Sequence, residues 1–513
     1  MNQRKAGALL SYVYLALTFL IGIFYTPILL DILGESEYGV YSVASSAIAF
    51  LAVLDLGFSQ TMIRYVAKCK ALNDIEGEKK LNGMFLTLYL MIAAIALIAG
   101  IILFANLEFV FQKGFTAEET SKLSIIFFIL LINLVVSFPL GIYNSIISAN
   151  EGFIFLKLVT IISSILTHAG ILVALFMGYK SITMALITTI VSIFLKILTA
   201  LYGTNKYQIR FIFHGFDKKI LKEICVFSFY VFLNIVIDQL YANTDKIILG
   251  ALCSSVAVTV YTVGVQFYSY FEQFSTSISG VFLPKVTKLV ALNDSMKDIS
   301  ELFIRIGRIQ FILLGFLMGG FVLLGKEFIR LWVGQEYIMS YYIALVVITP
   351  ALIPFSQNIG ISVLRAMNKH KFRSIIYFFI ALANVVLSIP LALCFGGIGA
   401  AMATCFATCC GQILIMNWFY YKKIGLDIPK YWKTIVPILL KIALICCIGY
   451  GIIELLNLAG ISSIFYSSLN GWLMLVCKGI VYIVTFVACA WRMILNSYEK
   501  SLVKEILRKR KRQ

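Results

Sequence analysis

Two carboxylates lie inside an apolar stretch of membrane-spanning length near the middle of the chain. Residues 224–249 are long enough to cross a bilayer as one helix, and they carry Asn234, Asp238, Tyr241 and Asp245. The successive spacings of four, three and four residues place these four side chains on one helical face. A carboxylate at membrane depth is costly unless it faces protein or water. This face therefore predicts a cation site or a protonation switch.

A structural reading of the same stretch stays open. Asp245 precedes Lys246, and the two could form a fixed pair. The other polar side chains could hydrogen-bond a neighbouring helix. Among the acids of this stretch, we expect Asp238 to matter most for transport, because Asp245 lies near the outer end of the predicted helix.

Polar side chains inside other apolar segments are further candidates for substrate binding or ion coupling. Asp55 lies well inside the predicted helix 39–63, and Lys196 is the main cation within the first twelve predicted helices. In the predicted helix 256–282, one face carries Gln266, Tyr270 and Gln273. Such a polar and aromatic face suits sugar binding, because hydroxyls need donors and acceptors and rings pack on sugar faces. Hydrogen bonding between helices is the alternative.

Four cations near the predicted cytoplasmic helix ends are candidates for phosphate contacts. These are Arg64, Lys157, Arg308 and Arg365. Arginine in particular binds phosphate oxygens in a bidentate manner. Each of them could instead snorkel to the lipid headgroups. We expect no metal site and no cofactor, because nearly all of the 11 cysteines lie in apolar segments, and the cluster at 405–410 has no histidine or carboxylate nearby. No nucleophile, phosphate-loop or metalloprotease motif indicates an enzyme.

The composition predicts that these side chains belong to the helices of an all-α polytopic membrane protein. The chain has 513 residues, of which 61% are hydrophobic and 13% charged. A soluble domain carries about 25% charged residues. The net charge of +18 does not indicate nucleic acid, because most lysines and arginines fall in loops on one side of the predicted membrane. By the positive-inside rule both termini are cytoplasmic, and the basic tail 508–512 lies against anionic lipid headgroups.

A near-constant offset indicates that the chain contains a duplication. The run 32–34 matches 248–250, and Pro139 matches Pro354. We predict about fourteen spans, each of the order of 20 residues. Residues 1–205 and 223–421 would form two parallel six-helix bundles. Residues 435–491 would add two further helices, and 492–513 a basic cytoplasmic tail.

Several stretches resemble a known family. The runs 5–43, 54–65, 244–250 and 396–404 resemble the Wzx-type oligosaccharide flippases of O-antigen and capsule synthesis, within the superfamily that also holds multidrug extruders and lipid II flippases. The resemblance implies a MATE-like pair of bundles in the bacterial cytoplasmic membrane. It implies translocation of an undecaprenyl-pyrophosphate-linked oligosaccharide from the inner to the outer leaflet, with coupling to H+ or Na+ as an option. The partners would be this lipid-linked substrate, membrane lipids and other polysaccharide-assembly proteins.

Two other functions stay open at this point. Asp55 and Asp238 would suit a MATE-type antiporter for drugs or cations, because an acidic cleft attracts cationic substrates. A membrane glycan polymerase or ligase is the second alternative, although such an enzyme would favour a larger external loop than this sequence contains.

Overall fold

The structure is a computed structural model that describes residues 3–216, 218–291, 295–367, 369–458 and 471–501. Within these ranges the chain is helical and contains no strand. It packs into two compact units, and each combines segments that are distant in sequence. Unit 1 holds residues 1–262 and 374–404, and unit 2 holds 263–373 and 405–513. The predicted all-α membrane fold is confirmed. The predicted bundles, residues 1–205 and 223–421, were defined by the internal duplication and not by packing, so they stay a prediction. The basic tail 508–512 lies outside the described residues.

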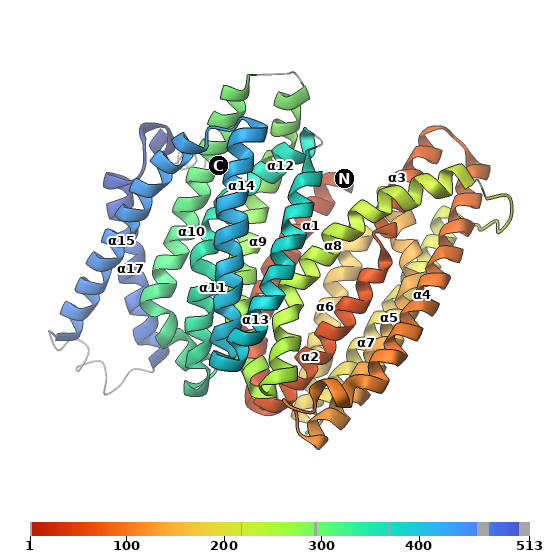
Figure 1. Cartoon of the computed structure of the whole chain (residues 1–513), viewed down its shortest axis with the longest axis horizontal. Helices are drawn as coiled ribbons and strands as arrows, with labels where there is room; N and C mark the ends of the chain where they lie inside the picture. The colour runs from red at the N-terminus through yellow and green to blue at the C-terminus, as the bar shows by residue number, and fades with distance from the viewer. Residues whose placement is uncertain (1–2, 217, 292–294, 368, 459–470, 502–513) are drawn as a thin grey trace. The chain divides into compact units, whose positions relative to one another are not determined.

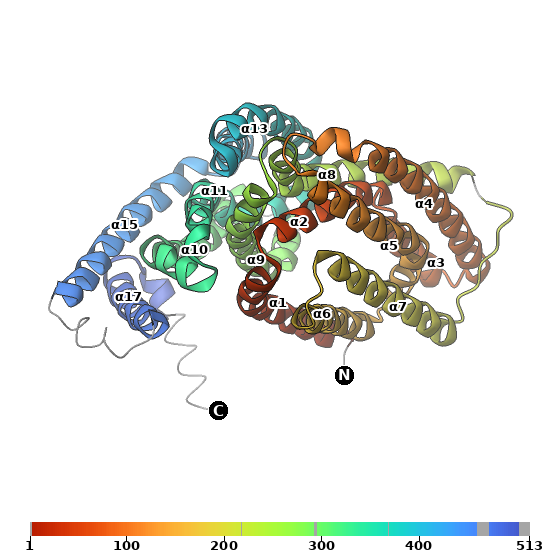
Figure 2. The ribbon, with the colours of Figure 1, turned by 90° about the horizontal axis from the view of Figure 1, so that it is seen from below.

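Unit 1 is built around α5. Helices α4 and α7 pack on α5, and α1 packs along α6 (Figures 1 and 2). The start of α9, Ser255–Ala291, and most of α13, His370–Ala407, complete the unit. The other helices of unit 1 are α1 Gln3–Leu33, α2 Glu35–Ala52, α3 Phe58–Ala71, α4 Ile75–Phe111, α5 Ala117–Ala149, α6 Phe153–Phe176, α7 Ser181–Tyr207 and α8 Lys218–Leu252.

Unit 2 is built around α10, Met296–Trp332. The helices α15, Ile428–Leu458, and α17, Gly471–Met493, pack on α10 and on each other. The approach is close, because a Cβ added at Gly315 would come within 2.4 Å of Ile442 Cδ1. An ion pair of 2.8 Å between Lys478 and Glu327 joins α17 to α10. The remaining elements are η2 Gln335–Tyr337, α11 Ile338–Ser356, α12 Asn358–Ala366, η3 Thr408–Ile415, α14 Met416–Phe419 and η4 Tyr420–Ile424.

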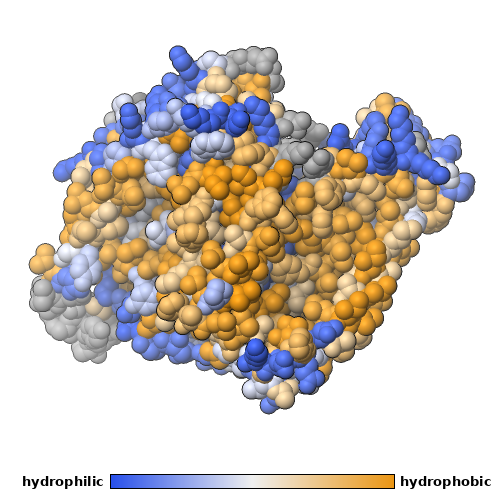
Figure 3. Space-filling model, in the orientation of Figure 1, coloured by the Kyte–Doolittle hydropathy of each residue, from blue (hydrophilic) through white to orange (hydrophobic). Residues whose placement is uncertain are grey.

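The helices have the length and surface of membrane spans. Twelve segments of the described residues are long and apolar enough to cross a bilayer. The sides of the helices are apolar in Figure 3, and hydrophilic residues gather toward their ends. One of the twelve segments, Phe372–Ile424, has 53 residues and is long enough for two spans, whereas α9, which matches the helix predicted at 256–282, is not among them. The count of fourteen therefore stays a prediction.

The single helix predicted at 39–63 is interrupted, which corrects that expectation. The chain leaves α2 through the short helix η1, Val53–Asp55. Leu56 and Gly57 then adopt left-handed conformations with φ of 53° and 70°, and α3 begins at Phe58. The physical reason is local, because the Asp55 side chain accepts hydrogen bonds from the backbone N–H groups of Gly57 and Ser59. These are groups at a helix start that lack helical partners.

The chain reverses direction inside α13. Gly396 has a non-helical conformation with φ 58° and ψ −138°, and a Cβ at Gly399 would come within 1.9 Å of the Leu391 carbonyl oxygen. Asn384 and Thr404 are hydrogen-bonded at 3.3 Å. In a straight helix these two residues would be roughly 30 Å apart. The segment is therefore a helical hairpin, and its two arms face each other.

Candidate functional site

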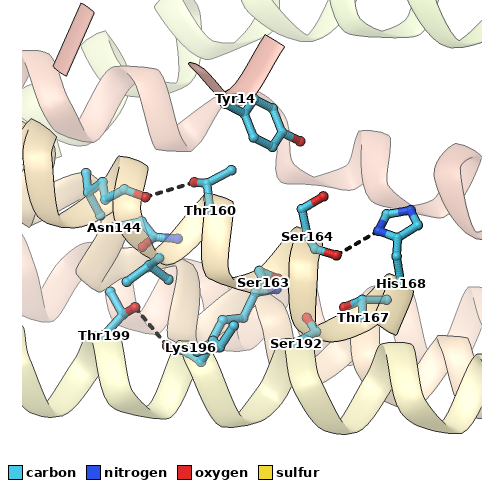
Figure 4. A pocket seen from close by; sticks show the side chains of 13 residues that line it. Tyr14, Asn144, Thr160, Ser163, Ser164, Thr167, His168, Ser192, Lys196 and Thr199 are labelled. Carbon is cyan, nitrogen blue, oxygen red and sulfur yellow. Dashed lines mark hydrogen bonds between the residues drawn. The ribbon is translucent and has the colours of Figure 1, made fainter. Parts of the chain in front are cut away.

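A polar pocket lies inside unit 1, between α1, α5, α6 and α7. Its volume is about 460 Å³, within the range of about 300–1,000 Å³ that is usual for small-molecule sites. Its polar side chains point toward the cavity in Figure 4. The lining residues with polar side chains are Tyr14, Asn144, Thr160, Ser163, Ser164, Thr167, His168, Ser192, Lys196 and Thr199.

The helical repeat explains why these residues meet. Residues 160, 163, 164, 167 and 168 of α6 recur at intervals of three and four, which is one helical face. Ser192, Lys196 and Thr199 repeat the pattern on α7. The polar stripes of two otherwise apolar helices therefore line one cavity instead of facing lipid.

Several polar side chains of the pocket make no hydrogen bond to the described residues. The hydroxyls of Thr160 and Thr199 donate to the carbonyls of Leu156 and Leu195, each at 2.8 Å. By contrast, no hydrogen bond within the described residues engages the side chains at positions 14, 144, 163, 167 and 192. These groups can donate to and accept from a ligand.

Lys196 is the one lysine or arginine that lines the pocket. Its ammonium donates a hydrogen bond to the hydroxyl of Ser137 on α5, which in turn donates to the Asn133 side-chain oxygen at 3.2 Å. In the part of the chain that the structure describes, no ion pair joins Lys196 to a carboxylate. His168 is placed by a hydrogen bond of 2.7 Å between Nδ1 and the Ser164 carbonyl, and Tyr25 packs edge-on against its ring.

A second polar cluster surrounds Asp245, whose side chain is only 3% exposed. Its carboxylate accepts hydrogen bonds from the hydroxyls of Tyr261 at 2.5 Å, Ser388 at 2.8 Å and Thr404 at 2.8 Å. Asn384 donates to the Thr404 hydroxyl, and its own side-chain oxygen is buried and has no hydrogen-bond partner among the described residues. The cluster joins α8 and α9 to both arms of the α13 hairpin (Figure 1). The three groups that donate to its one negative charge are all hydroxyls.

The contacts of Asp245 do not include the ion pair with Lys246 that the sequence left open. No ion pair between the two is found among the described residues, and the three hydroxyls are the partners of the carboxylate. Because no described residue forms an ion pair with this carboxylate, the arrangement suits a proton or a small hard cation, for which oxygen is the preferred ligand.

Asp55 lies in a third polar cluster, at the break between α2 and α3. The Tyr89 hydroxyl of α4 reaches its carboxylate. Ser59 is hydrogen-bonded to Ser145 of α5 at 3.0 Å. The cluster is set in the apolar core of unit 1, which includes Phe58 and Phe85. Asp55 thus caps a helix start at membrane depth.

The other polar residues predicted on α8 are distributed differently. Asn234 accepts a hydrogen bond of 2.7 Å from Ser374, so that it faces α13 as Asp245 does. Asp238 is exposed and Tyr241 is half-buried. In unit 2, two residues of the predicted sugar-binding face are bonded to each other, because the Gln266 amide donates a hydrogen bond of 2.6 Å to the Tyr270 hydroxyl. Gln273, on the same helix, is half-buried.

The four predicted phosphate contacts lie in separate places. Arg64 is exposed, and the central carbon of its guanidinium lies 5.0 Å from the centre of the Phe227 ring. Arg365 is exposed in the last turn of α12. Lys157 is half-buried in the first turns of α6. Arg308 is engaged within unit 2, because its Nε donates to Glu499 at 2.6 Å and its Nη2 to the Ile494 carbonyl. The roles of all four remain predictions.

The sequence reading did not identify most of the pocket. It singled out Lys196 as a charge within an apolar helix but missed the uncharged hydroxyls beside it. A signal was available, because the hydroxyl and imidazole side chains of residues 160–168 follow the helical repeat. Hydroxyls in membrane helices usually satisfy backbone carbonyls, so that this pattern alone carries little weight.

Comparison with known proteins gives a family and a fold. The model of the family described as "Polysaccharide biosynthesis protein" matches residues 5–290. A Shigella flexneri protein named "Putative O-antigen transporter" is 21% identical over 398 residues, which cover 76% of this chain and 90% of that protein.

Solved transporter structures share the fold. The lipid II flippase MurJ in an inward closed conformation has a TM-score of 0.67 at 18% identity, over 94% of this chain and 98% of that one. An inward-facing multidrug resistance MATE family transporter has a TM-score of 0.60 at 13% identity, over 80% and 94%.

These matches agree with the helical architecture and with the absence of enzyme motifs in the sequence. The predicted resemblance to oligosaccharide flippases of the multidrug and polysaccharide exporter superfamily is confirmed, and the alternative of a glycan polymerase or ligase is set aside. The chain is a multi-pass membrane protein, and it belongs to the polysaccharide biosynthesis protein family.

Proposed function

We propose that this protein translocates a lipid-linked oligosaccharide, carried on undecaprenyl pyrophosphate, from the inner to the outer leaflet of the bacterial cytoplasmic membrane. Both termini are cytoplasmic in this proposal. The observation that carries it is the pocket of unit 1, where unengaged hydroxyl and amide groups line a cavity of about 460 Å³. A sugar ring presents many hydroxyls that need both donors and acceptors, and this lining offers both.

The same pocket argues against the drug antiporter. A site for cationic drugs gains most from carboxylates near the ligand, because they supply the opposite charge. This pocket has no carboxylate in its lining, and its charged side chain is the ammonium of Lys196. The structural likeness to MATE transporters concerns the fold, which does not decide the substrate.

Transport requires that substrate sites open to the two leaflets in turn. Exporters built from two helix bundles achieve this by alternating access. The helical backbone is interrupted by positive φ angles at Leu56 and Gly57 and again at Gly396. Arg64, Lys157 and Arg365 remain candidates for contacts with the pyrophosphate, whereas Arg308 would first have to leave Glu499.

Ion coupling is the finer part of the proposal, and we assign it to the Asp245 cluster. A buried carboxylate without an opposite charge binds either a proton or a cation. The three hydroxyls that contact its carboxylate support this assignment, as does the buried side-chain oxygen of Asn384, which has no hydrogen-bond partner among the described residues. Loading and release of H+ or Na+ there would change the hydrogen bonds that join α8 to α13.

Complementation tests the proposed function. A strain that lacks its own O-antigen flippase but makes a defined lipid-linked glycan should regain surface glycan when it expresses this protein. A panel of glycans of different composition belongs in the test, because the natural sugar is unknown. If no glycan reaches the surface and the cells instead gain drug efflux, the antiporter reading replaces this one.

A further inference from the structure

The helical segment of residues 338–366 is broken inside unit 2. Helix α11 ends at Ser356, α12 begins at Asn358, and Gln357 lies between them with φ −98° and ψ 6°. A regular helix has ψ near −42°, so that a rotation of roughly 50° about this one bond would largely restore it. The Gly360 N–H donates at 2.8 Å to the carbonyl three residues before it, which is a tighter turn than that of an α-helix. The break is therefore small and local.

A side chain of α9 takes the place of the missing helical partner. In a continuous helix, the carbonyl of Phe355 would accept a hydrogen bond from the N–H of Ile359. Here it accepts a hydrogen bond of 2.5 Å from the hydroxyl of Ser275. That hydroxyl in turn accepts a hydrogen bond of 2.6 Å from the side-chain amide of Asn358, the first residue of α12. Ser275 is fully buried and thus holds both sides of the break.

The bent arrangement leaves one buried acceptor unused. Gln310 of α10 is fully buried, and its amide nitrogen donates to the Ser275 carbonyl at 2.9 Å and to the Ser279 hydroxyl at 2.8 Å. Its side-chain oxygen has no hydrogen-bond partner among the described residues. A buried acceptor without a donor costs free energy. The amide nitrogen also lies 3.4 Å from the hydroxyl oxygen of Ser275, so that a donor for this amide group is close by.

A continuous helix would use the same groups differently. The Ile359 N–H would then bond the Phe355 carbonyl, and the single proton of the Ser275 hydroxyl would be free. The unused side-chain oxygen of Gln310 is an acceptor for that proton. Each arrangement thus has a hydrogen bond that the other lacks, and two conformations of similar free energy are both populated.

The residue at the break is also bonded to a second irregular segment. The Gln357 side-chain amide donates at 2.8 Å to the Asn417 side-chain oxygen, and Asn417 donates at 2.7 Å to the Ile413 carbonyl. Ile413 lies in η3, which is a π-helical stretch. Such turns are rare and are frequent at functional sites. A change of conformation at Gln357 would therefore act on η3 and α14.

We propose that residues 355–359 form a hinge with a bent and a continuous state, and that the Ser275 hydroxyl donates to the Phe355 carbonyl in the first and to the Gln310 side-chain oxygen in the second. The hinge belongs to unit 2, whereas the pocket and the Asp245 cluster belong to unit 1. Its use in transport rests on the proposed function, because alternating access requires parts of the protein to change shape.

Two substitutions would move this hinge in opposite directions. Gln310→Met removes the acceptor of the continuous state together with the unused oxygen of the bent state, so it favours the bent state. Ser275→Ala leaves the Phe355 carbonyl without its donor in the bent state, so it favours the continuous state. Ser277→Ala is the matched control, because the Ser277 hydroxyl donates at 2.7 Å to the Gln273 carbonyl of its own helix.

Fluorine NMR of the full-length protein in detergent measures the two states. The probe is 4-fluorophenylalanine in place of Phe355, whose ring lies 5.2 Å from that of Tyr268 and therefore senses a movement of the break. Gln310→Met and Ser275→Ala should change the ratio of the states about tenfold in opposite directions, the factor that one net hydrogen bond is worth. Ser277→Ala should leave the spectrum unchanged. Shifts of both variants in the same direction, or no shift, overturn the inference.

Stability and transport complete the test. A hinge predicts that Gln310→Met keeps at least the thermal stability of wild type and yet translocates a lipid-linked glycan several-fold more slowly, because the transport cycle needs both states. A loss of stability in Gln310→Met without a shift of the resonance would show a purely structural amide and overturn the inference. If the resonances shift as expected but wild type translocates no glycan, the hinge is correct and the proposed function is wrong.

Discussion

The carboxylate of Asp245 accepts a hydrogen bond from the hydroxyl of Thr404 at 2.8 Å, although 159 residues separate them in the chain. Ser388, on the other arm of the same hairpin, donates to the second carboxylate oxygen. One acid on α8 thereby holds both arms of α13 within unit 1. A change in the charge state of Asp245 would therefore alter the packing of α13 against α8.

The first prediction concerns this carboxylate. Asp245→Asn should abolish the response of transport to an imposed H+ or Na+ gradient, because an amide neither binds a proton nor attracts a cation. Translocation by a reconstituted protein, with and without each gradient, measures this. Asp31→Asn is the control, since Asp31 is exposed at the end of α1. An unchanged gradient response in Asp245→Asn would place coupling elsewhere.

The hydroxyls around Asp245 predict a loss of stability. Ser388→Ala and Thr404→Val each remove a donor to a buried carboxylate, which should lower the free energy of unfolding by about 1–3 kcal/mol. Thermal unfolding in detergent measures the change. Thr204→Val, at an exposed site whose hydroxyl donates to the Ala200 carbonyl, should change it much less. Equal losses in all three variants would contradict the assigned partners.

Asp55 combines a capping role with a charge, and two substitutions separate them. Asparagine accepts the same backbone hydrogen bonds, so we expect Asp55→Asn to express nearly as wild type and to transport more slowly. Asp55→Ala loses the cap as well and should be destabilised by about 0.5–2 kcal/mol. Transport assays combined with unfolding curves measure both effects. Wild-type transport by Asp55→Asn would reduce Asp55 to a structural cap.

A pair of glycines tests the packing of unit 1. A Cβ at Gly39 of α2 would come within 2.0 Å of the Ser255 carbonyl oxygen, whereas a Cβ at Gly141 of α5 would meet no atom within 4 Å. Gly39→Ala should therefore destabilise the protein, and Gly141→Ala should stabilise α5 by about 0.5–1 kcal/mol through its better helix propensity. Equal thermal stability of the two variants would argue against the contact between α2 and α9.

The sequence predicted the features that follow from local patterns. The apolar runs and their polar ends gave the helical membrane fold, and the motifs gave the family. The partners of Asp245 could not be predicted, because they depend on the reversal at Gly396 and on the approach of segments more than a hundred residues apart. The break after Asp55 was missed because the surrounding apolar pattern continues through it. The pocket was missed because hydroxyls at helical spacing are common in membrane helices.

Movement of a lipid-linked oligosaccharide across a bilayer by this protein can be measured directly. The most direct measurement uses proteoliposomes that contain the purified full-length protein and a fluorescent oligosaccharide linked to undecaprenyl pyrophosphate. An impermeant quencher or glycosidase reports how much of the substrate is in the outer leaflet. Wild-type protein is expected to move the substrate between the leaflets many-fold faster than it moves in protein-free liposomes. Exchange no faster than in protein-free liposomes, by a correctly folded wild-type protein supplied with either ion gradient, would contradict the proposed function.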